Sequence, residues 1–183
     1  SAASDVYKRQ VVFLLKSAMT RGGTVENVYV TRVEAENVRR VFGADPNWNP
    51  KYSYSTLPEA YKGKEIPEHW EVMLTPVTPT EKGHPHFRNI YLSQVKANNV
   101  QEFVSASGIN DSLRLENFYL HGIEAQAQKA GTVCCTQNFN ITEVKLDVPD
   151  AQPIKLKENE QSNIRVEYVK QPHEQLANEA PKH

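Results

Sequence analysis

The stretch Leu115-Glu-Asn-Phe-Tyr-Leu120 is the clearest copy of a six-residue phrase that recurs along this chain and decides its fold. Two close copies are Val25-Glu-Asn-Val-Tyr-Val30 and Phe87-Arg-Asn-Ile-Tyr-Leu92, and two looser ones are Ile141-Thr-Glu-Val-Lys-Leu146 and Gln161-Ser-Asn-Ile-Arg-Val166. From Phe87 onward, successive copies begin 28, 26 and 20 residues apart, which is the range of solenoid repeats. The first two copies begin 62 residues apart, so a long loop must interrupt the repeat.

Apolar residues occupy the fourth and sixth positions of every copy, as Phe118 and Leu120 do. This two-residue period is typical of a strand that buries one face. In the three clearest copies the pattern continues with a branched and then a small apolar residue, such as Ile123 and Ala125. We therefore expect each copy to form a strand that pairs in parallel with the equivalent strand of the next repeat.

Two polar or aromatic positions also recur: the third position holds Asn27, Asn89, Asn117 and Asn163, and the fifth holds Tyr29, Tyr91 and Tyr119. An asparagine at one place per turn can hydrogen-bond to its neighbours above and below, so we expect an asparagine ladder and a stack of tyrosines. The fold class predicted is all-β, a parallel β-helix (solenoid) with one long loop insertion. A β-sandwich is the alternative, because sandwiches also space short strands regularly.

The chain is expected to contain three segments, of which residues 11–169 form the β-helix coils with a loop insertion at 43–83. Within residues 1–10, Asp5-Val-Tyr-Lys-Arg-Gln10 resembles one reading frame of a transposon adapter used in DNA sequencing libraries. We interpret that segment as an artefact and expect the native protein to begin further upstream. Residues 170–183 lack an apolar period and are expected to form a disordered tail.

The loop insertion is rich in proline and aromatic residues, and long insertions in solenoids often lie on one face and carry the function. It contains six prolines together with Trp48, Tyr52, Tyr54, Tyr61 and Trp70. Because pyranose faces pack well on aromatic rings, we interpret Trp48, Tyr52, Tyr54 and Trp70 as a sugar-binding wall. The alternative interpretation is that these rings form a small core for the loop itself.

Composition argues against several other classes of function. A net charge of −1 without a basic patch is not that of a protein that binds nucleic acid or an anionic membrane surface. No apolar run approaches the roughly 20 residues that cross a bilayer. The only cysteines, Cys134 and Cys135, are adjacent, so we expect them on opposite faces of a strand as packing thiols. Neither they nor the histidines follow a metal-ligand spacing, and no metal or cofactor is expected.

Three motifs resemble glycoside hydrolase family 28, the polygalacturonases and related pectin-degrading enzymes. They are Arg21-Gly-Gly-Thr-Val-Glu-Asn-Val28, His86-Phe-Arg-Asn-Ile-Tyr-Leu92 and Gly108-Ile-Asn-Asp-Ser112. The resemblance covers about residues 16–147. It depends on the order in which the motifs follow one another, because each motif alone could occur in any β-helix. It implies a right-handed parallel β-helix, a secreted or periplasmic location, and hydrolysis of pectic polysaccharide (galacturonan or a related polymer) or oligosaccharide with inversion.

The catalytic motifs of that family are missing from this chain. Inversion needs a carboxylic acid and a carboxylate base, which the family takes from Asn-Thr-Asp and Asp-Asp motifs followed by Gly-His-Gly, and none of the three occurs here. The resemblance therefore implies the C-terminal part of a hydrolase, inactive by itself and without catalytic residues of its own. The family's Arg-Ile-Lys motif falls on Leu14-Leu-Lys16, so Lys16 matches and the arginine does not.

The resemblance assigns substrate contact to Lys16. Arg21 precedes a Gly-Gly turn and is interpreted as lining the same groove, and the alternative is a turn residue that holds the chain by hydrogen bonds. A lysine holds a carboxylate as a point charge, without the two-point grip of an arginine, which leaves room for pectic linkages other than polygalacturonate. Two alternatives stay open. One is a β-helical carbohydrate-binding or adhesin module, and the other is a fragment of a polysaccharide lyase, which would need calcium held by clustered acidic residues.

Overall fold

The computed structural model describes residues 10–53 and 55–169, and these form a mostly β structure. The strands are β1 (Val11–Lys16), β2 (Thr24–Glu36), β3 (Arg40–Asp45), β4 (His86–Ser107), β5 (Leu115–Asp147), β6 (Lys155–Glu160) and β7 (Asn163–Val169). All pairings between these strands are parallel, which confirms the expected all-β class. The proposed adapter segment, apart from Gln10, and the tail at 170–183 lie outside the described residues.

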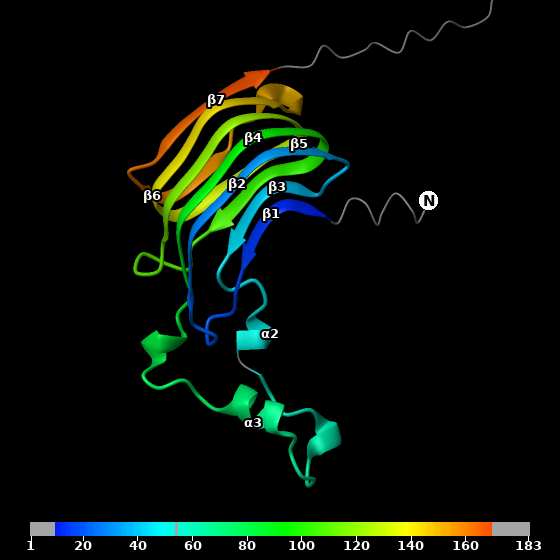
Figure 1. The fold of residues 1–183 in the computed structure, drawn as a ribbon, viewed down its shortest axis with the longest axis vertical. Coiled ribbons are helices and arrows are strands. Elements are labelled where there is room, and N and C mark those ends of the chain that lie inside the picture. The colour runs from blue at the N-terminus through cyan, green and yellow to red at the C-terminus, as the bar shows by residue number, and fades with distance from the viewer. Residues whose placement is uncertain (1–9, 54, 170–183) are drawn as a thin grey trace, which may run out of the picture.

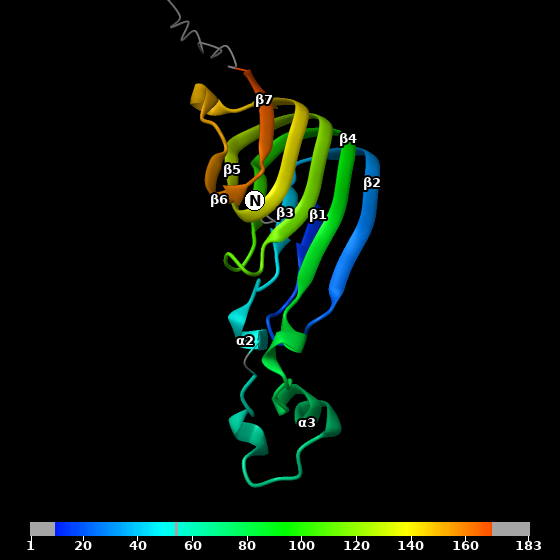
Figure 2. The same cartoon turned by 90° about the vertical axis from the view of Figure 1, so that its left-hand side faces the viewer.

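The seven strands make one sheet in the order β1-β3-β4-β5-β6, with β2 also paired to β4 and β7 to β5. The first part of β4 pairs with β2 and its last part with β3, while β5 pairs with β4, β6 and β7 in turn. Figure 1 shows these strands as curved ribbons lying side by side, and Figure 2 shows the bend from the side. The long strands therefore bend around the core instead of crossing it once.

The first three copies of the phrase pair in the expected register. Val28 lies opposite Ile90, and Ile90 lies opposite Phe118. The tyrosine stack is also confirmed: the ring of Tyr91 lies 4.5 Å from that of Tyr29 and 4.8 Å from that of Tyr119, with nearly parallel planes. Parallel strands carry identical residues at about the spacing that suits stacked rings.

The expected register of the two looser copies is wrong. That register places Val144 beside both Phe118 and Ile164, whereas β7 pairs Val144 with Val166 and Ile141 with Ile164. Phe139 stacks on Phe118 with ring centroids 5.4 Å apart, so β5 returns alongside its own first part. The large ring and its neighbouring asparagine set the register of this turn, not the alternating aliphatic residues.

The asparagine ladder exists, but its fourth member differs from the one expected. Asn89 donates to Asn27 (3.2 Å), Asn117 to Asn89 (3.0 Å) and Asn138 to Asn117 (2.9 Å), each from Nδ2 to Oδ1. All four residues have φ between 55° and 57°, a left-handed conformation that asparagine tolerates well. Asn163 is not part of this ladder; it is exposed and lies opposite Asn140.

The core lies inside the bend of the strands and is built from aromatic and aliphatic side chains. Its largest fully buried members are Phe42, Phe103, Phe118 and Phe139. The ring of Phe42 meets that of Phe118 edge to face, with centroids 5.9 Å apart. Such edge-to-face contacts between rings from different strands stabilise the core beyond the burial of apolar area alone.

The helices are short and most of them lie in the loop between β3 and β4. They are α2 (Pro50–Ser53), α3 (Glu68–Leu74) and the 3₁₀ segments Glu59–Tyr61, Thr80–Gly83 and Pro149–Ala151. Because β3 continues to Asp45, the first residues of the expected 43–83 insertion belong to a strand that pairs with β1. The loop projects from one edge of the strands in Figure 1. None of the helices within the described ranges has the length and apolar character that a bilayer-spanning helix requires.

Candidate functional site

Three of the expected sugar-binding residues meet where β1 and β3 end. Lys16 is the last residue of β1 and pairs with Asp45 at the end of β3, so the segments that follow both strands start side by side. Trp48 and Tyr52 stack with ring centroids 5.8 Å apart and planes at 24°. The Lys16 Nζ lies 4.2 Å from the centroid of the Trp48 ring. We call Lys16, Trp48 and Tyr52 the aromatic platform.

Backbone hydrogen bonds fix the position of the platform relative to the strands. The Ser17 amide donates to the Asp45 carbonyl (3.1 Å), and the Trp48 amide donates to the Ser17 carbonyl (3.2 Å). Between them, the Asp45 carboxylate accepts the Asn47 amide at 2.9 Å, a local turn that aspartate commonly stabilises. The indole of Trp48 is therefore held on the sheet and not on a free loop.

Ser53 holds the other side of the platform. It is one of only two buried polar residues within the described ranges, and its Oγ accepts the Met19 amide at 2.9 Å. The same hydroxyl donates to Asn47 Oδ1 at 2.7 Å. Helix α2, which carries Tyr52, is thus tied to the segment after β1. A site ordered before its ligand arrives loses less conformational entropy on binding.

The exposure of the platform suits ligand binding better than core packing. Trp48 is 45% exposed and Tyr52 is 51% exposed, so neither ring serves mainly as a core for the loop. An exposed indole offers an apolar surface to the CH groups of a pyranose ring. The Lys16 ammonium, which lies over the Trp48 ring, adds a positive charge that attracts a carboxylate on the same sugar. The platform can therefore bind an acidic sugar by stacking and charge together.

The other expected contacts lie elsewhere. Trp70, on α3, packs against Tyr61 with ring centroids 6.3 Å apart, and both are partly buried, as expected of a small loop core. Arg21 lines a separate cavity of about 510 Å³ bordered by α3, together with Met73 and His84. Tyr54 lies outside the described residues. The structure thus brings Lys16, Trp48 and Tyr52 together and places Trp70 and Arg21 outside their cluster.

A larger cavity that the sequence analysis did not predict crosses β2, β4, β5 and β7. It has a volume of about 1220 Å³ and is lined mainly by charged side chains and valines. Glu34, Lys96 and Glu124 occupy matching positions on successive strands, so opposite charges alternate across it. Each of these residues is the tenth from the start of its phrase, and that periodicity was the signal available in the sequence.

Comparison of the chain with protein-family models, with curated proteins and with solved structures finds no match in any of the three. The fold and the site therefore define the class as a mostly β protein of parallel strands that presents an exposed aromatic and cationic cluster.

Proposed function

We propose that this chain is the C-terminal part of a right-handed parallel β-helix of the polygalacturonase type, and that its aromatic platform binds pectic polysaccharide. In this proposal the parent protein is a secreted or periplasmic glycoside hydrolase that cleaves galacturonan or a related polymer with inversion. The single observation that carries it is the Lys16 ammonium, 4.2 Å from the centroid of an exposed indole.

The parallel register supports the β-helix part of the proposal. Equivalent positions of β2, β4 and β5 lie opposite one another along most of β2, and asparagines and tyrosines stack between them. A solenoid in which each turn leans on its neighbours has this pattern. An ordinary sandwich pairs most of its strands antiparallel, whereas the strand pairs here are parallel.

The outer edge of β2 supports the presence of further coils in the parent protein. Within the described residues, β2 pairs only with β4. Its Val28 and Val30 are partly exposed, whereas the matching Ile90 and Leu92 of β4 are fully buried. A further coil on β2 would bury this apolar row. In this proposal such coils also supply the two carboxyl groups that inverting hydrolysis requires.

Calorimetric titration tests the platform with two oligosaccharides that differ only at C6: a galacturonic acid oligomer, which has a carboxylate there, and the galactose oligomer, which has a hydroxymethyl group. We expect saturable binding of the acidic oligomer. Trp48→Ala should weaken it by about tenfold or more, equivalent to about 1.4 kcal/mol. Lys16→Met should weaken binding of the acidic oligomer alone, because the neutral oligomer lacks the carboxylate that the ammonium attracts.

The matched control is Lys51→Met, which removes an exposed lysine beside Tyr52 whose side chain is not part of the platform. It should bind both oligomers as the unaltered chain does. An acidic oligomer that binds the Trp48→Ala variant as tightly as the original protein would contradict the proposal.

A second candidate function is a β-helical carbohydrate-binding or adhesin module. The observation that favours it is that all three platform residues lie in this chain, whereas the family's paired aspartate motifs do not occur in its sequence. Release of reducing ends from galacturonan by the parent protein separates the two. Release supports the hydrolase, and binding without release supports the module.

A further inference from the structure

Two neighbouring thiols lie on the same side of the chain at a corner formed by β4, β5 and β6. Ser107 pairs with Cys134, and Cys134 pairs with Lys157, so Cys135 and Glu158 occupy equivalent places on β5 and β6. Cys135 has φ 53° and Glu158 has φ 52°. This left-handed conformation turns the Cys135 side chain toward that of Cys134, and the expectation that they face opposite ways is wrong.

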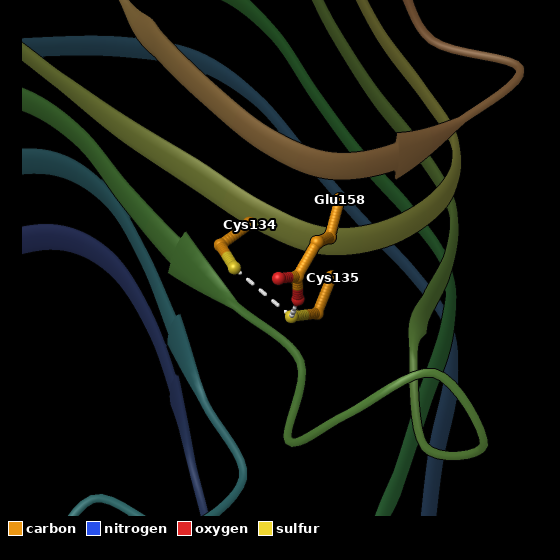
Figure 3. Close-up of side chains that lie close together, drawn as sticks. All are labelled: Cys134, Cys135 and Glu158. Atoms are coloured by element: carbon orange, nitrogen blue, oxygen red, sulfur yellow. Dashed lines mark hydrogen bonds between the residues drawn. The ribbon is translucent and has the colours of Figure 1, made fainter.

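The resulting cluster contains three ligand atoms of the kinds that bind metal ions. Both cysteines are free thiols with their Sγ atoms 2.9 Å apart, and Cys135 Sγ lies 3.3 Å from Glu158 Oε2. One atom from each of the three residues lies within 4.8 Å of the other two. Figure 3 shows the Glu158 carboxylate directed toward the two sulfur atoms.

Burial differs across the cluster in a way that leaves one side open. Cys135 is buried, Cys134 is half-buried and Glu158 is exposed. A metal ion held by these three ligands would therefore keep a fourth position facing solvent. Metal sites with three protein ligands and one open position are common for zinc.

A hydrogen bond from the Cys135 thiol to the Glu158 carboxylate links two of the three residues of the cluster. Burial, followed by hydrogen bonds to Cys134 and Glu158, raises the pKa of the Cys135 thiol to about 12. The hydrogen bond from Cys135, followed by the Lys157 charge, lowers the pKa of the Glu158 carboxyl group. In this geometry the Cys135 thiol donates a hydrogen bond to the Glu158 carboxylate, and the three ligand atoms lie close enough together for one cation to contact all of them.

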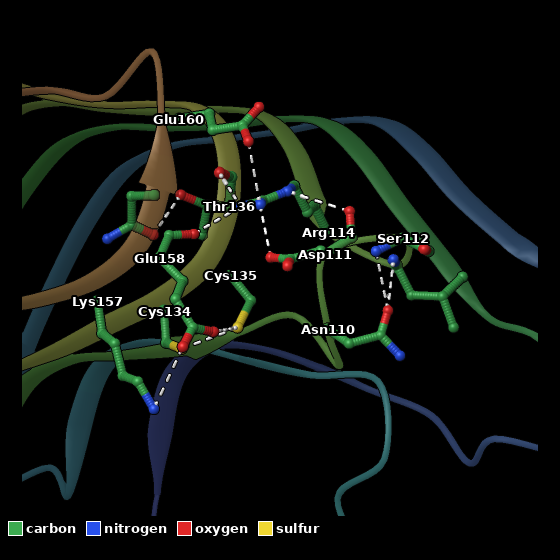
Figure 4. Close-up of polar contacts among 12 residues, drawn as sticks. Asn110, Asp111, Ser112, Arg114, Cys134, Cys135, Thr136, Lys157, Glu158 and Glu160 are labelled. Atoms are coloured by element: carbon green, nitrogen blue, oxygen red, sulfur yellow. Dashed lines mark hydrogen bonds and ion pairs between the residues drawn. The ribbon is translucent and has the colours of Figure 1, made fainter.

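Neighbouring groups hold the backbone of this corner. The Gly108 amide donates to the Cys134 carbonyl at 3.0 Å, and a Cβ on Gly108 would lie 2.3 Å from the Cys135 carbonyl oxygen. Arg114 donates from Nη1 to the Glu158 carbonyl at 2.5 Å and to the Thr136 carbonyl at 3.3 Å. Figure 4 shows this network around the three ligands. The ligands are therefore carried by fixed strand backbone.

We propose that Cys134, Cys135 and Glu158 form a site for one thiophilic divalent cation, such as Zn²⁺. Binding forms two metal–sulfur bonds and one metal–oxygen bond, releases the two thiol protons to solvent and involves no oxidation or reduction. Tetrahedral zinc with metal–sulfur bonds of about 2.3 Å holds its sulfur atoms roughly 3.8 Å apart. The two sulfur atoms must therefore separate by about 0.9 Å from their present distance, a shift within reach of side-chain rotation. The ammonium of Lys157, 3.4 Å from Glu158 Oε1, offsets the negative charge of the resulting site.

Titration of the reduced protein with Co²⁺, followed by displacement with Zn²⁺, tests this site. We expect one equivalent of Co²⁺ to produce a thiolate-to-cobalt charge-transfer band that Zn²⁺ abolishes. Cys134→Ser should reduce the band to half its intensity or less, because only the Cys135 thiolate remains. Glu158→Gln should weaken Co²⁺ binding by about tenfold, because a charged oxygen ligand is lost. Glu124→Gln, which removes an exposed glutamate from the outer face, is the control and should change nothing.

Two results would overturn this inference. One is a charge-transfer band that keeps its full intensity in the Cys134→Ser variant. The other is a protein, kept under reducing conditions, whose mass is lighter by two hydrogen atoms and which has no free thiols, because the cysteines would then form a disulfide. Cys134 is half-buried and Glu158 exposed, so both variants should fold, and unchanged circular dichroism checks that they do.

Discussion

At the scale of single residues, this fold depends on side chains that tolerate a left-handed backbone. Asparagine occupies four equivalent corners, and the amide of each successive residue donates to the one before it. The side chain thus supplies both the backbone conformation and a hydrogen bond between turns. Asn117 combines both roles: it has a left-handed backbone, and its side chain donates to Asn89 and accepts from Asn138.

Replacement of Asn117 tests the ladder. Asn117→Ala should lower the free energy of unfolding by about 3 kcal/mol, with about 1 kcal/mol from each of two hydrogen bonds and about 1 from the backbone. Asn117→Gly also removes the two hydrogen bonds, but glycine adopts a left-handed backbone without a steric penalty. This variant should therefore lower the free energy of unfolding by only about 2 kcal/mol. Denaturation in urea measures both values. Asn163→Ala is the control outside the ladder and should change stability by less than about 0.5 kcal/mol.

The sequence contained the correct fourth member of the ladder. Gln137-Asn-Phe-Asn-Ile141 matches Glu116-Asn-Phe-Tyr-Leu120 at the asparagine and the phenylalanine, and these two asparagines are 21 residues apart. Alternating aliphatic residues favoured a different alignment, because period-two patterns recur in every strand and define a face without defining a register. Two segments that share both a phenylalanine and a corner asparagine define the strand register more specifically.

At the scale of elements, β4 and β5 approach closely at one glycine. Gly131 has φ 99°, and a Cβ there would lie only 1.8 Å from the Val104 carbonyl oxygen. The strand must therefore bend at a residue without a side chain if its pairing with β4 is to continue. The paired stretch includes both Gly131 and the residues that lead into the cysteine corner.

Gly131→Ala tests this close approach, with Gly23→Ala as its matched control. Both glycines have φ near 90° to 100°, but a Cβ on Gly23 would meet nothing within 4 Å. Gly23→Ala should cost about 1 to 2 kcal/mol through its backbone alone. Gly131→Ala should cost at least about 3 kcal/mol, because strand displacement is added. Equal losses for both variants in thermal or urea unfolding would contradict the clash.

At the scale of the whole molecule, strands could be predicted from sequence better than the site. Period two and the recurring Tyr and Asn predict parallel strands because these depend on local pattern and repeated spacing. The loop has no repeat, so its pattern could not show that Trp48 meets Lys16 while Trp70 packs on Tyr61. The different positions of the two tryptophans depend on hydrogen bonds between distant parts of the chain, such as those of Ser53.

Fluorescence of single-tryptophan variants tests the central claim most directly, because Trp48 and Trp70 are the only tryptophans of the chain. Trp70→Phe leaves Trp48 as the reporter, and Trp48→Phe leaves Trp70. On titration with a galacturonic acid oligomer, we predict a saturable change in emission from the Trp70→Phe variant and none from the Trp48→Phe variant. A response from the Trp48→Phe variant alone would contradict the account and place the sugar on α3.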